Sequence, residues 1–345
     1  MAGEIDEALE LLEGSGPEYT GGLSNHGPMA AEALVALGRP EAVVPWVEEY
    51  RKKLHDRPVS TNPISPDEWQ ESLGDGRKLG EWRAFFEREL SDAPWQQVLD
   101  TWVARLAPGL VAAATHGVIR TGHAVRTLST GDTPDRRDEL ASGLGYWAAR
   151  YYRLPESGVA AASDALASQA IGNVQVAPKG ERGRGGIMIG VIAAAKQPEF
   201  PGVINLVEAS GDASAFVSDL TETFANVYLA NAHDTLSTIV FIHSVTAPSA
   251  IRLIAPHVSR ETAASAMRYG WQAAAALYAG FGETTAAPVV EETETNVDDL
   301  IDSAIATGDE HAIKFTEACL REHALNPAPV YLAAARDATA RLRRN

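Results

Sequence analysis

Four histidines lie in apolar or structured contexts where an imidazole could bind a metal ion. They are His26, His116, His243 and His311. A single histidine on an apolar face is usually a core residue that is hydrogen-bonded to a backbone carbonyl. Several buried imidazoles that converge are costly unless a metal ion or a carboxylate compensates for their burial. The sequence therefore allows either a metal site or separate core histidines.

The spacing of these histidines does not decide between the two interpretations, because none has a diagnostic pattern such as HExxH. His311 and Lys314 are three residues apart, which places both side chains on one face of an expected helix. The chain has a single cysteine, Cys319. That count excludes an intrachain disulfide and a CxxC zinc or redox site.

The other histidines are weaker candidates. His123 follows His116 by seven residues, so on a helix it faces the same side two turns away. It is a possible ligand, but contact with a ligand or with a substrate is the better interpretation. His233 precedes the expected helix cap Asp234 and is interpreted as a loop residue at a helix start. The rest sit in polar or helix-end settings, where a favourable interaction with the helix C-terminus explains them: His55, His257 and His323.

Composition limits the possible partners. The 345 residues are 45% hydrophobic, which is ample for a large core, and the formal net charge is −17. Because such an acidic surface repels phosphate backbones and anionic lipids, we expect no nucleic-acid partner and no membrane partner. The N-terminus lacks the pattern of a secretory signal, and no apolar run has the length of a membrane span. We therefore expect a cytoplasmic protein.

Helix signals dominate the first half of the chain. Proline in the first turn and glycine beyond the last turn predict a helix from Pro28 to Leu37. The stretch from Arg57 to Gly80 is rich in proline, serine and glycine and is expected to be a surface loop that could cover a pocket. Further helices or apolar segments are expected over 41–54, 82–89, 94–106, 111–128 and 134–152.

The second half continues this pattern. Gln175 to Gly190 is a glycine-rich, basic loop, and Met188 stands where a GxGxxG fingerprint needs its third glycine. Helices are expected from Asp212, from Asp234 to His243, from Thr246 toward Ile254, over 259–280, and from points near Asp298 and Thr307. Thr307 and Glu310 have the spacing of a capping box, and the acidic stretch 283–296 is expected to be exposed. We predict an all-α protein with a single large helical domain over residues 1–345 and long loops around a central metal pocket.

Four short segments carry a resemblance to a known family. They are LSNHGPM at 23–29, THGVIR at 115–120, FIHSVTAP at 241–248 and HAIK at 311–314. Together, in this order and spacing, they resemble the questin oxidase-like family over nearly the whole chain.

This resemblance implies a mononuclear non-haem iron enzyme. Fungal members open the quinone ring of anthraquinones such as questin in a Baeyer–Villiger-like oxidation with O₂. The implied ligands of Fe²⁺ are four histidines and a carboxylated lysine, which correspond to His26, His116, His243, His311 and Lys314.

The resemblance also implies a small aromatic substrate, in a pocket lined by Trp and Tyr side chains. Arg120 and His123 are the candidates for orienting its phenolate or quinone oxygen. Some relatives are expected to need NADPH, although the chain has no fingerprint for it. The chain looks shorter than the fungal members, and the match near Tyr269 is loose, so the substrate does not transfer with the metal ligands.

A carboxylated lysine makes chemical sense here. An ammonium group has no lone pair and cannot bind a cation, but burial in an apolar setting lowers the pKa of a lysine. The neutral amine can then add carbon dioxide, and the carbamate is an anionic oxygen ligand. Imidazole and oxygen ligands without thiolate suit iron.

Two other functions remain open. Carboxylated lysines with histidines also occur in metal-dependent hydrolases and lyases, where the metal ion activates water. A non-catalytic relative that only binds a ligand is the third possibility, although the presence of all four histidines and Lys314 argues against it. The sequence does not predict the oligomeric state.

Overall fold

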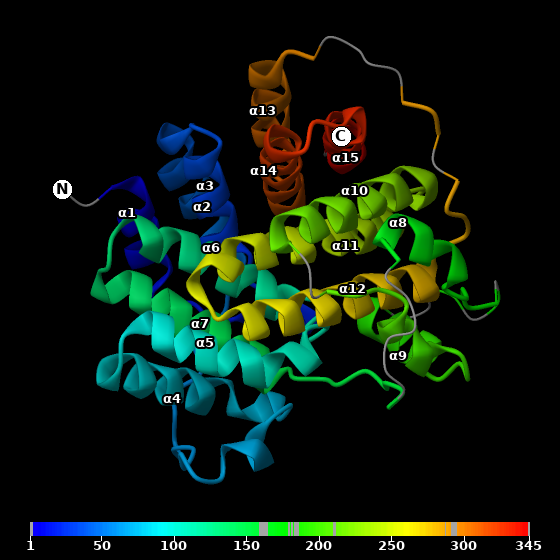
Figure 1. Ribbon diagram of the computed structural model, residues 1–345. Coiled ribbons are helices and arrows are strands. Elements are labelled where there is room, and N and C mark those ends of the chain that lie inside the picture. The colour runs from blue at the N-terminus through cyan, green and yellow to red at the C-terminus, as the bar shows by residue number, and fades with distance from the viewer. Residues whose placement is uncertain are drawn as a thin grey trace. The chain divides into compact units, whose positions relative to one another are not determined.

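The protein is built almost entirely from α-helices (Figure 1). The computed structural model describes residues 3–158, 165–178, 180, 182, 186–209, 212–286, 288–290 and 295–343. In this part of the chain the strands are β1 (Glu18–Tyr19) and β2 (Leu23–Ser24), an antiparallel pair with Glu18 opposite Ser24 and Tyr19 opposite Leu23. The predicted all-α class is confirmed.

The chain divides into two compact units. Unit 1 consists of residues 1–152 and 253–262, and unit 2 of residues 153–252 and 263–345. Two long helices, α11 and α12, each have residues in both units. The prediction of one domain over residues 1–345 stays a prediction.

Unit 1 contains the helices of the N-terminal part of the chain. They are α1 (Glu4–Leu12), α2 (Gly27–Ala36), α3 (Val43–Tyr50), α4 (Leu79–Asp92), α5 (Trp95–Leu106), α6 (His116–Thr130) and α7 (Pro134–Ala149). Unit 1 also contains short 3₁₀ turns, of which the last lies between α11 and α12: Thr20–Gly22, Pro40–Ala42, Arg51–Lys53, Trp69–Ser72, Gly76–Lys78, Ala107–Gly109 and Ala255–His257.

Helix α7 packs against both α4 and α6. The α6–α7 contact is close at Gly117, where an added Cβ would lie 2.7 Å from the Cβ of Trp147. A glycine is therefore needed directly after His116 for the two helices to approach this closely. On the other side of α7, Trp82, Phe86 and Trp102 form a buried aromatic cluster with edge-to-face contacts.

Unit 2 contains most of the remaining helices. They are α8 (Ala167–Ala170), α9 (Ile187–Ala195), α10 (Ala213–Asn231), α11 (Thr235–Ile254), α12 (Arg260–Phe281), α13 (Val297–Ala306), α14 (Glu310–Leu325) and α15 (Pro329–Leu342), with 3₁₀ turns at Ile171–Asn173 and Phe200–Asn205. Helix α14 packs against α10, α13 and α15.

Local signals account for many of the helix starts. Proline occupies the first turn of α2, α7 and α15. Thr133, Asp212, Asn296 and Asp309 are N-cap residues in extended conformation, and each side chain accepts a hydrogen bond from a backbone N–H of the first turn. Because Asp309 caps α14, the capping box predicted at Thr307 is wrong.

Other sequence predictions need correction as well. The helix predicted to stop at His243 and restart at Thr246 is continuous in α11, with Pro248 inside it. An internal proline removes one helical hydrogen bond, but the burial of neighbours such as Val245 and Ile251 offsets that cost. Helix α15 was not predicted as a separate helix. The predicted basic loop, Gln175 to Gly190, includes the start of α9 at Ile187. Some residues of the predicted loop and of the predicted acidic stretch lie outside the described residues: 179, 181 and 183–185 in the loop, and 287 and 291–294 in the acidic stretch.

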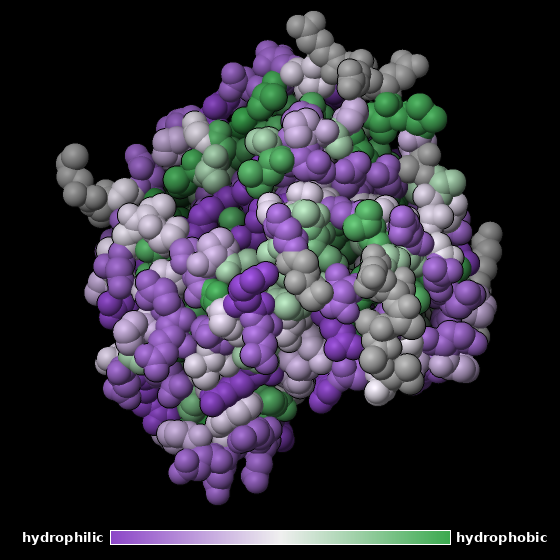
Figure 2. Space-filling model, in the orientation of Figure 1, coloured by the Kyte–Doolittle hydropathy of each residue, from purple (hydrophilic) through white to green (hydrophobic). Residues whose placement is uncertain are grey.

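One segment, Thr235–His257, is long and apolar enough to span a membrane, contrary to the expectation from the sequence. However, 78% of its most apolar window is buried, as in the core helix of a soluble protein. The face of the molecule in Figure 2 is largely hydrophilic, with scattered hydrophobic patches. This surface agrees with the strongly acidic composition.

A buried carboxylate, Glu322 of α14, is the centre of the polar interactions in unit 2. Arg252 donates to it from Nε and Nη2 at 2.9 and 2.7 Å. Arg321 donates at 3.1 Å and the Ser249 hydroxyl at 2.7 Å. These bonds tie α11 to α14, the two helices that carry His243 and His311.

We expect Glu322→Ala to destabilise the protein by about 3 kcal/mol, because it removes a fully buried carboxylate and leaves the half-buried guanidinium of Arg252 without its partner. Urea unfolding followed by circular dichroism measures this change. The control is Glu49→Ala, which removes an exposed ion pair with Lys52 and should cost at most about 1 kcal/mol. Equal effects of the two substitutions would contradict a central role for Glu322.

Candidate metal centre

His26 and His116 form a buried pair in unit 1. His26 is the N-cap of α2, where its backbone N–H donates to the Tyr50 hydroxyl at 2.7 Å, and His116 is the first residue of α6. Their Nε2 atoms lie 2.8 Å apart. Two nitrogens bound at right angles to one metal ion, each at about 2.1 Å, would be about 3 Å apart. The pair therefore has the spacing of two ligands of one ion.

A strained turn fixes the ring of His116. Ala113, Ala114 and Thr115 have φ values of 50°, 53° and 72°, so three consecutive residues with side chains are left-handed. Each such residue costs roughly 1–2 kcal/mol. The turn brings the Ala113 carbonyl oxygen to 2.5 Å from His116 Nδ1. Since a carbonyl can only accept, Nδ1 carries the proton and Nε2 keeps its lone pair.

His243 and His311 form a second buried pair, in unit 2, with ring centroids 5.5 Å apart. His243 lies in the middle of α11, and its Nδ1 is 2.7 Å from the Ile239 carbonyl oxygen. His311 follows the N-cap of α14, and its Nδ1 faces Asp309 Oδ1 at 3.4 Å. Asp309 also accepts from the backbone N–H of His311 at 2.8 Å, so one carboxylate caps the helix and orients the ring.

The four predicted histidines form one buried group. One ligand atom from each can be chosen so that all four lie within 4.8 Å of one another. In His116, His243 and His311 the Nδ1 atom faces a backbone carbonyl or a carboxylate, which leaves Nε2 for a metal ion. Protein ligands of metal ions are commonly oriented in this way. The group is compatible with a bound metal ion.

Lys314 lies on α14, one turn after His311, and its side chain is buried, with 2% of the residue exposed. Burial lowers the pKa of its ammonium group to about 7. No ion pair of its Nζ occurs within the described residues. Burial therefore favours the neutral amine, which is the form that can react with carbon dioxide.

His123 of α6 belongs to a second buried cluster, which it forms with Arg126 of the same helix and Glu32 of α2. Its Nδ1 is 2.6 Å from Oε2 of Glu32, and Arg126 donates to both oxygens of Glu32 at 2.5 Å. Burial favours the protonated acid, but the charge of Arg126 and the hydrogen bond from His123 hold the pKa of Glu32 below its ordinary value. Helices α2 and α6 are thus joined twice, by His26 with His116 and, farther along both helices, by Glu32 with His123.

Arg120 has a partner in the protein. Its Nε and Nη2 donate to the two oxygens of Glu139, both at 2.7 Å, and both side chains are buried. The cavities beside it have volumes of 20 and 50 Å³, which suit water but not a polycyclic substrate. Orientation of a substrate by Arg120 therefore stays a prediction.

Three residues around the histidines were missed from the sequence. Glu32 is the one charged residue of the otherwise apolar helix GPMAAEALVA, and that isolation was a usable signal. Asp309, two residues before His311, was overlooked because Thr307 gave the better capping pattern. The backbone conformation at Thr115 had no sequence signal, since glycine or asparagine usually marks a left-handed residue.

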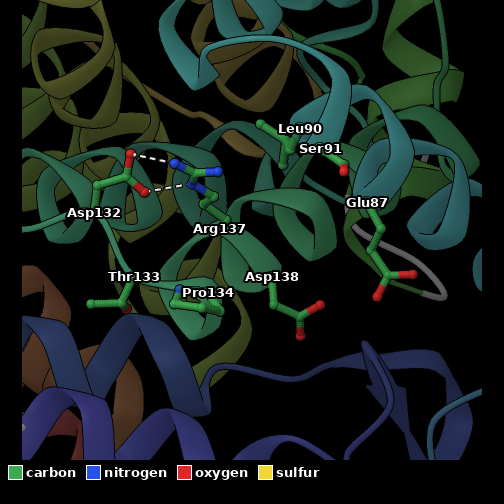
Figure 3. A pocket seen from close by; sticks show the side chains of 8 residues that line it. All are labelled: Glu87, Leu90, Ser91, Asp132, Thr133, Pro134, Arg137 and Asp138. Atoms are coloured by element: carbon green, nitrogen blue, oxygen red, sulfur yellow. Dashed lines mark hydrogen bonds and ion pairs between the residues drawn. The ribbon is translucent and has the colours of Figure 1, made fainter.

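Another hollow of 370 Å³ lies on unit 1 (Figure 3). Four of its eight lining residues are charged, and Arg137 there is paired with Asp132 at 2.5 and 2.8 Å. The lining residues are Glu87, Leu90, Ser91, Asp132, Thr133, Pro134, Arg137 and Asp138. None of the predicted site residues is among them, so this hollow is not a candidate for the metal centre.

Comparison with known proteins identifies a family. Among curated proteins, no sequence matches the chain. The family described as "Questin oxidase-like" matches residues 23–319, a range that includes His26, His116, His243, His311 and Lys314. Because this match covers most of the 345 residues, the chain belongs to the questin oxidase-like family.

Proposed function

We propose that the protein is a non-haem iron-dependent oxygenase that acts on an aromatic polyketide or anthraquinone-like substrate. The observation that carries the proposal is the buried four-histidine group, in which three rings have Nδ1 fixed by an acceptor. Membership of the questin oxidase-like family supports an oxidoreductase with an anthraquinone-like substrate. The reaction would be oxidative C–C cleavage or a Baeyer–Villiger-type ring opening with O₂.

The donor set favours iron. Imidazole nitrogen with one anionic oxygen suits Fe²⁺, whereas a structural zinc site commonly uses thiolates. Cys319 is buried, and its sulfur is not part of the histidine group. When bound, the metal ion would supply the redox chemistry that O₂ requires. The protein, with one buried free thiol and an acidic surface, suits the cytoplasm.

Lys314 would supply the anionic oxygen. The neutral amine attacks carbon dioxide, a C–N bond forms, one proton leaves, and the product is a carbamate with a single negative charge. Four neutral imidazoles leave the charge of a divalent ion uncompensated, so the carbamate reduces the cost of burying that ion. The position of Lys314 one helical turn from His311 supports this role.

The remaining residues would act on the substrate. His123 donates from Nδ1 to Glu32, so its Nε2 is the nitrogen that can accept a proton or a hydrogen bond. This arrangement suits the orientation of a phenolic hydroxyl. While Arg120 is paired with Glu139, it would act on the substrate only indirectly. Direct contact with the substrate would require that ion pair to open.

Oxygen consumption tests the proposed reaction. Protein loaded anaerobically with Fe²⁺ should consume O₂ when a polycyclic quinone or hydroquinone is added, with and without NADPH in parallel assays. No O₂ uptake with any such compound would show that the substrate class is wrong. Stoichiometric zinc with hydrolysis, and no gain from iron, would instead indicate a hydrolase, and tight ligand binding without turnover would indicate a binding protein.

Metal analysis of ligand variants tests whether the two histidine pairs bind one ion. His116→Ala in unit 1 and His243→Ala in unit 2 should each weaken iron binding by at least about 10–100-fold. The exposed His233 provides the control, and His233→Ala should bind one iron per chain like the native protein. If each ligand variant kept half of the iron, the pairs would bind separate ions. Bicarbonate should promote iron loading of the native protein but not of Lys314→Ala.

The pH dependence of stability tests the burial of Lys314. In the unfolded chain lysine has a pKa near 10.5, whereas in the folded protein it is about 7. Between these values the unfolded state binds more protons, so the metal-free protein gains stability as the pH rises, by up to about 1.4 kcal/mol per pH unit. Lys314→Met lacks this gain. It should exceed the native protein in stability most at pH 6, and the difference should narrow from pH 7 to pH 9; a constant difference would contradict a buried amine.

A further inference from the structure

Thr115 has a buried side chain whose hydroxyl makes no hydrogen bond to the described part of the protein. The residue is 0% exposed, and its Oγ1 has no hydrogen-bond partner within the described residues. A buried hydroxyl without a partner is unfavourable. Its immediate neighbour in the sequence is the candidate ligand His116.

The conformation of Thr115 explains why it does not cap its helix. Thr133 is the N-cap of α7 in extended conformation, and its hydroxyl accepts from the Arg136 backbone N–H. Thr115 holds the same position in α6, but with φ 72° and ψ −1° its side chain makes no capping hydrogen bond. The left-handed turn has thus removed the ordinary partner of this hydroxyl.

The other buried threonine hydroxyls without partners differ from Thr115. They are Thr223, Thr238, Thr316 and Thr339, and all four lie inside α-helices. A threonine within a helix can rotate its hydroxyl toward the carbonyl three or four residues earlier, as Thr121 does toward Gly117. Residues 113–115 are left-handed, and the carbonyl four residues earlier, that of Val111, accepts from the backbone N–H of Thr115 at 3.1 Å rather than from its hydroxyl. A partner from outside the chain would satisfy this hydroxyl.

We propose that the Thr115 hydroxyl donates a hydrogen bond to an oxygen or nitrogen atom of a ligand bound beside His116. This role rests on the proposed metal site. The ligand class is a hydrogen-bond acceptor: either a small anion on the metal ion or the carbonyl or phenolate oxygen of a quinone-like substrate. The strained turn includes Thr115 and directly precedes His116, which is consistent with the occurrence of backbone strain at functional sites.

Thr115→Val tests the proposal, because valine keeps the branched shape and removes the hydroxyl. The metal-free variant should be as stable as the native protein or more stable, and it should bind one Co²⁺ per chain. Azide titrated against the d–d bands of the Co²⁺ protein should bind about fivefold to tenfold more weakly, the effect of one lost hydrogen bond. Thr115→Ser should stay within about twofold of the native affinity.

Two controls separate the possible failures. Thr133→Val removes a capping hydroxyl and should lower the melting temperature without changing the azide affinity. The affinity for 1,8-dihydroxyanthraquinone, measured by its absorbance, distinguishes a substrate contact from a contact with the small anion. If Thr115→Val leaves both affinities unchanged, or destabilises the metal-free protein, the proposal is overturned. If the native protein binds no Co²⁺, the metal site itself fails, and this role fails with it.

Discussion

A hydrogen bond to one nitrogen of an imidazole fixes the direction in which its other nitrogen points. In this protein that constraint is met from the backbone or from a helix cap. The Ala113 and Ile239 carbonyls hold two rings, and the capping carboxylate Asp309 faces a third. Each acceptor lies two to four residues before its histidine. The orientation of these rings is therefore a property of local chain geometry, supported by the packing of the helices that carry them.

The charges of the buried carboxylates are balanced within each unit. Glu32 is matched by Arg126 and His123, Glu139 by Arg120, and Glu322 by Arg252 and Arg321. In each cluster the buried acid and its partners belong to the same unit. Lys314 differs from these groups, since it is a buried cation whose ammonium forms no ion pair within the described residues. Burial therefore favours its uncharged amine, which distinguishes it from the other buried basic residues.

The sequence predicted the helices and the grouping of the four histidines better than the backbone conformation of the connecting segments. Helical periodicity and terminal signals are local, so the all-α class and helices such as α2 and α12 followed from them. Pro248 misled because a local rule for ending helices was overridden by the burial of α11. The left-handed turn before His116 could not be predicted, because two alanines and a threonine give no local reason for it. Its cause must lie in the tertiary packing, which a single sequence does not display.

The left-handed turn also bears on the order of folding. A right-handed helix cannot nucleate through residues 113–115, so α6 must start beyond Thr115. The turn itself needs the packing of the folded protein to compensate for its strain, so the orientation that it gives to His116 depends on that packing. Unlike a zinc finger, in which metal binding drives an unfolded peptide to fold, such a chain would offer a metal ion a site that folding has already built. Metal acquisition would then be a maturation step, separate in time from chain folding.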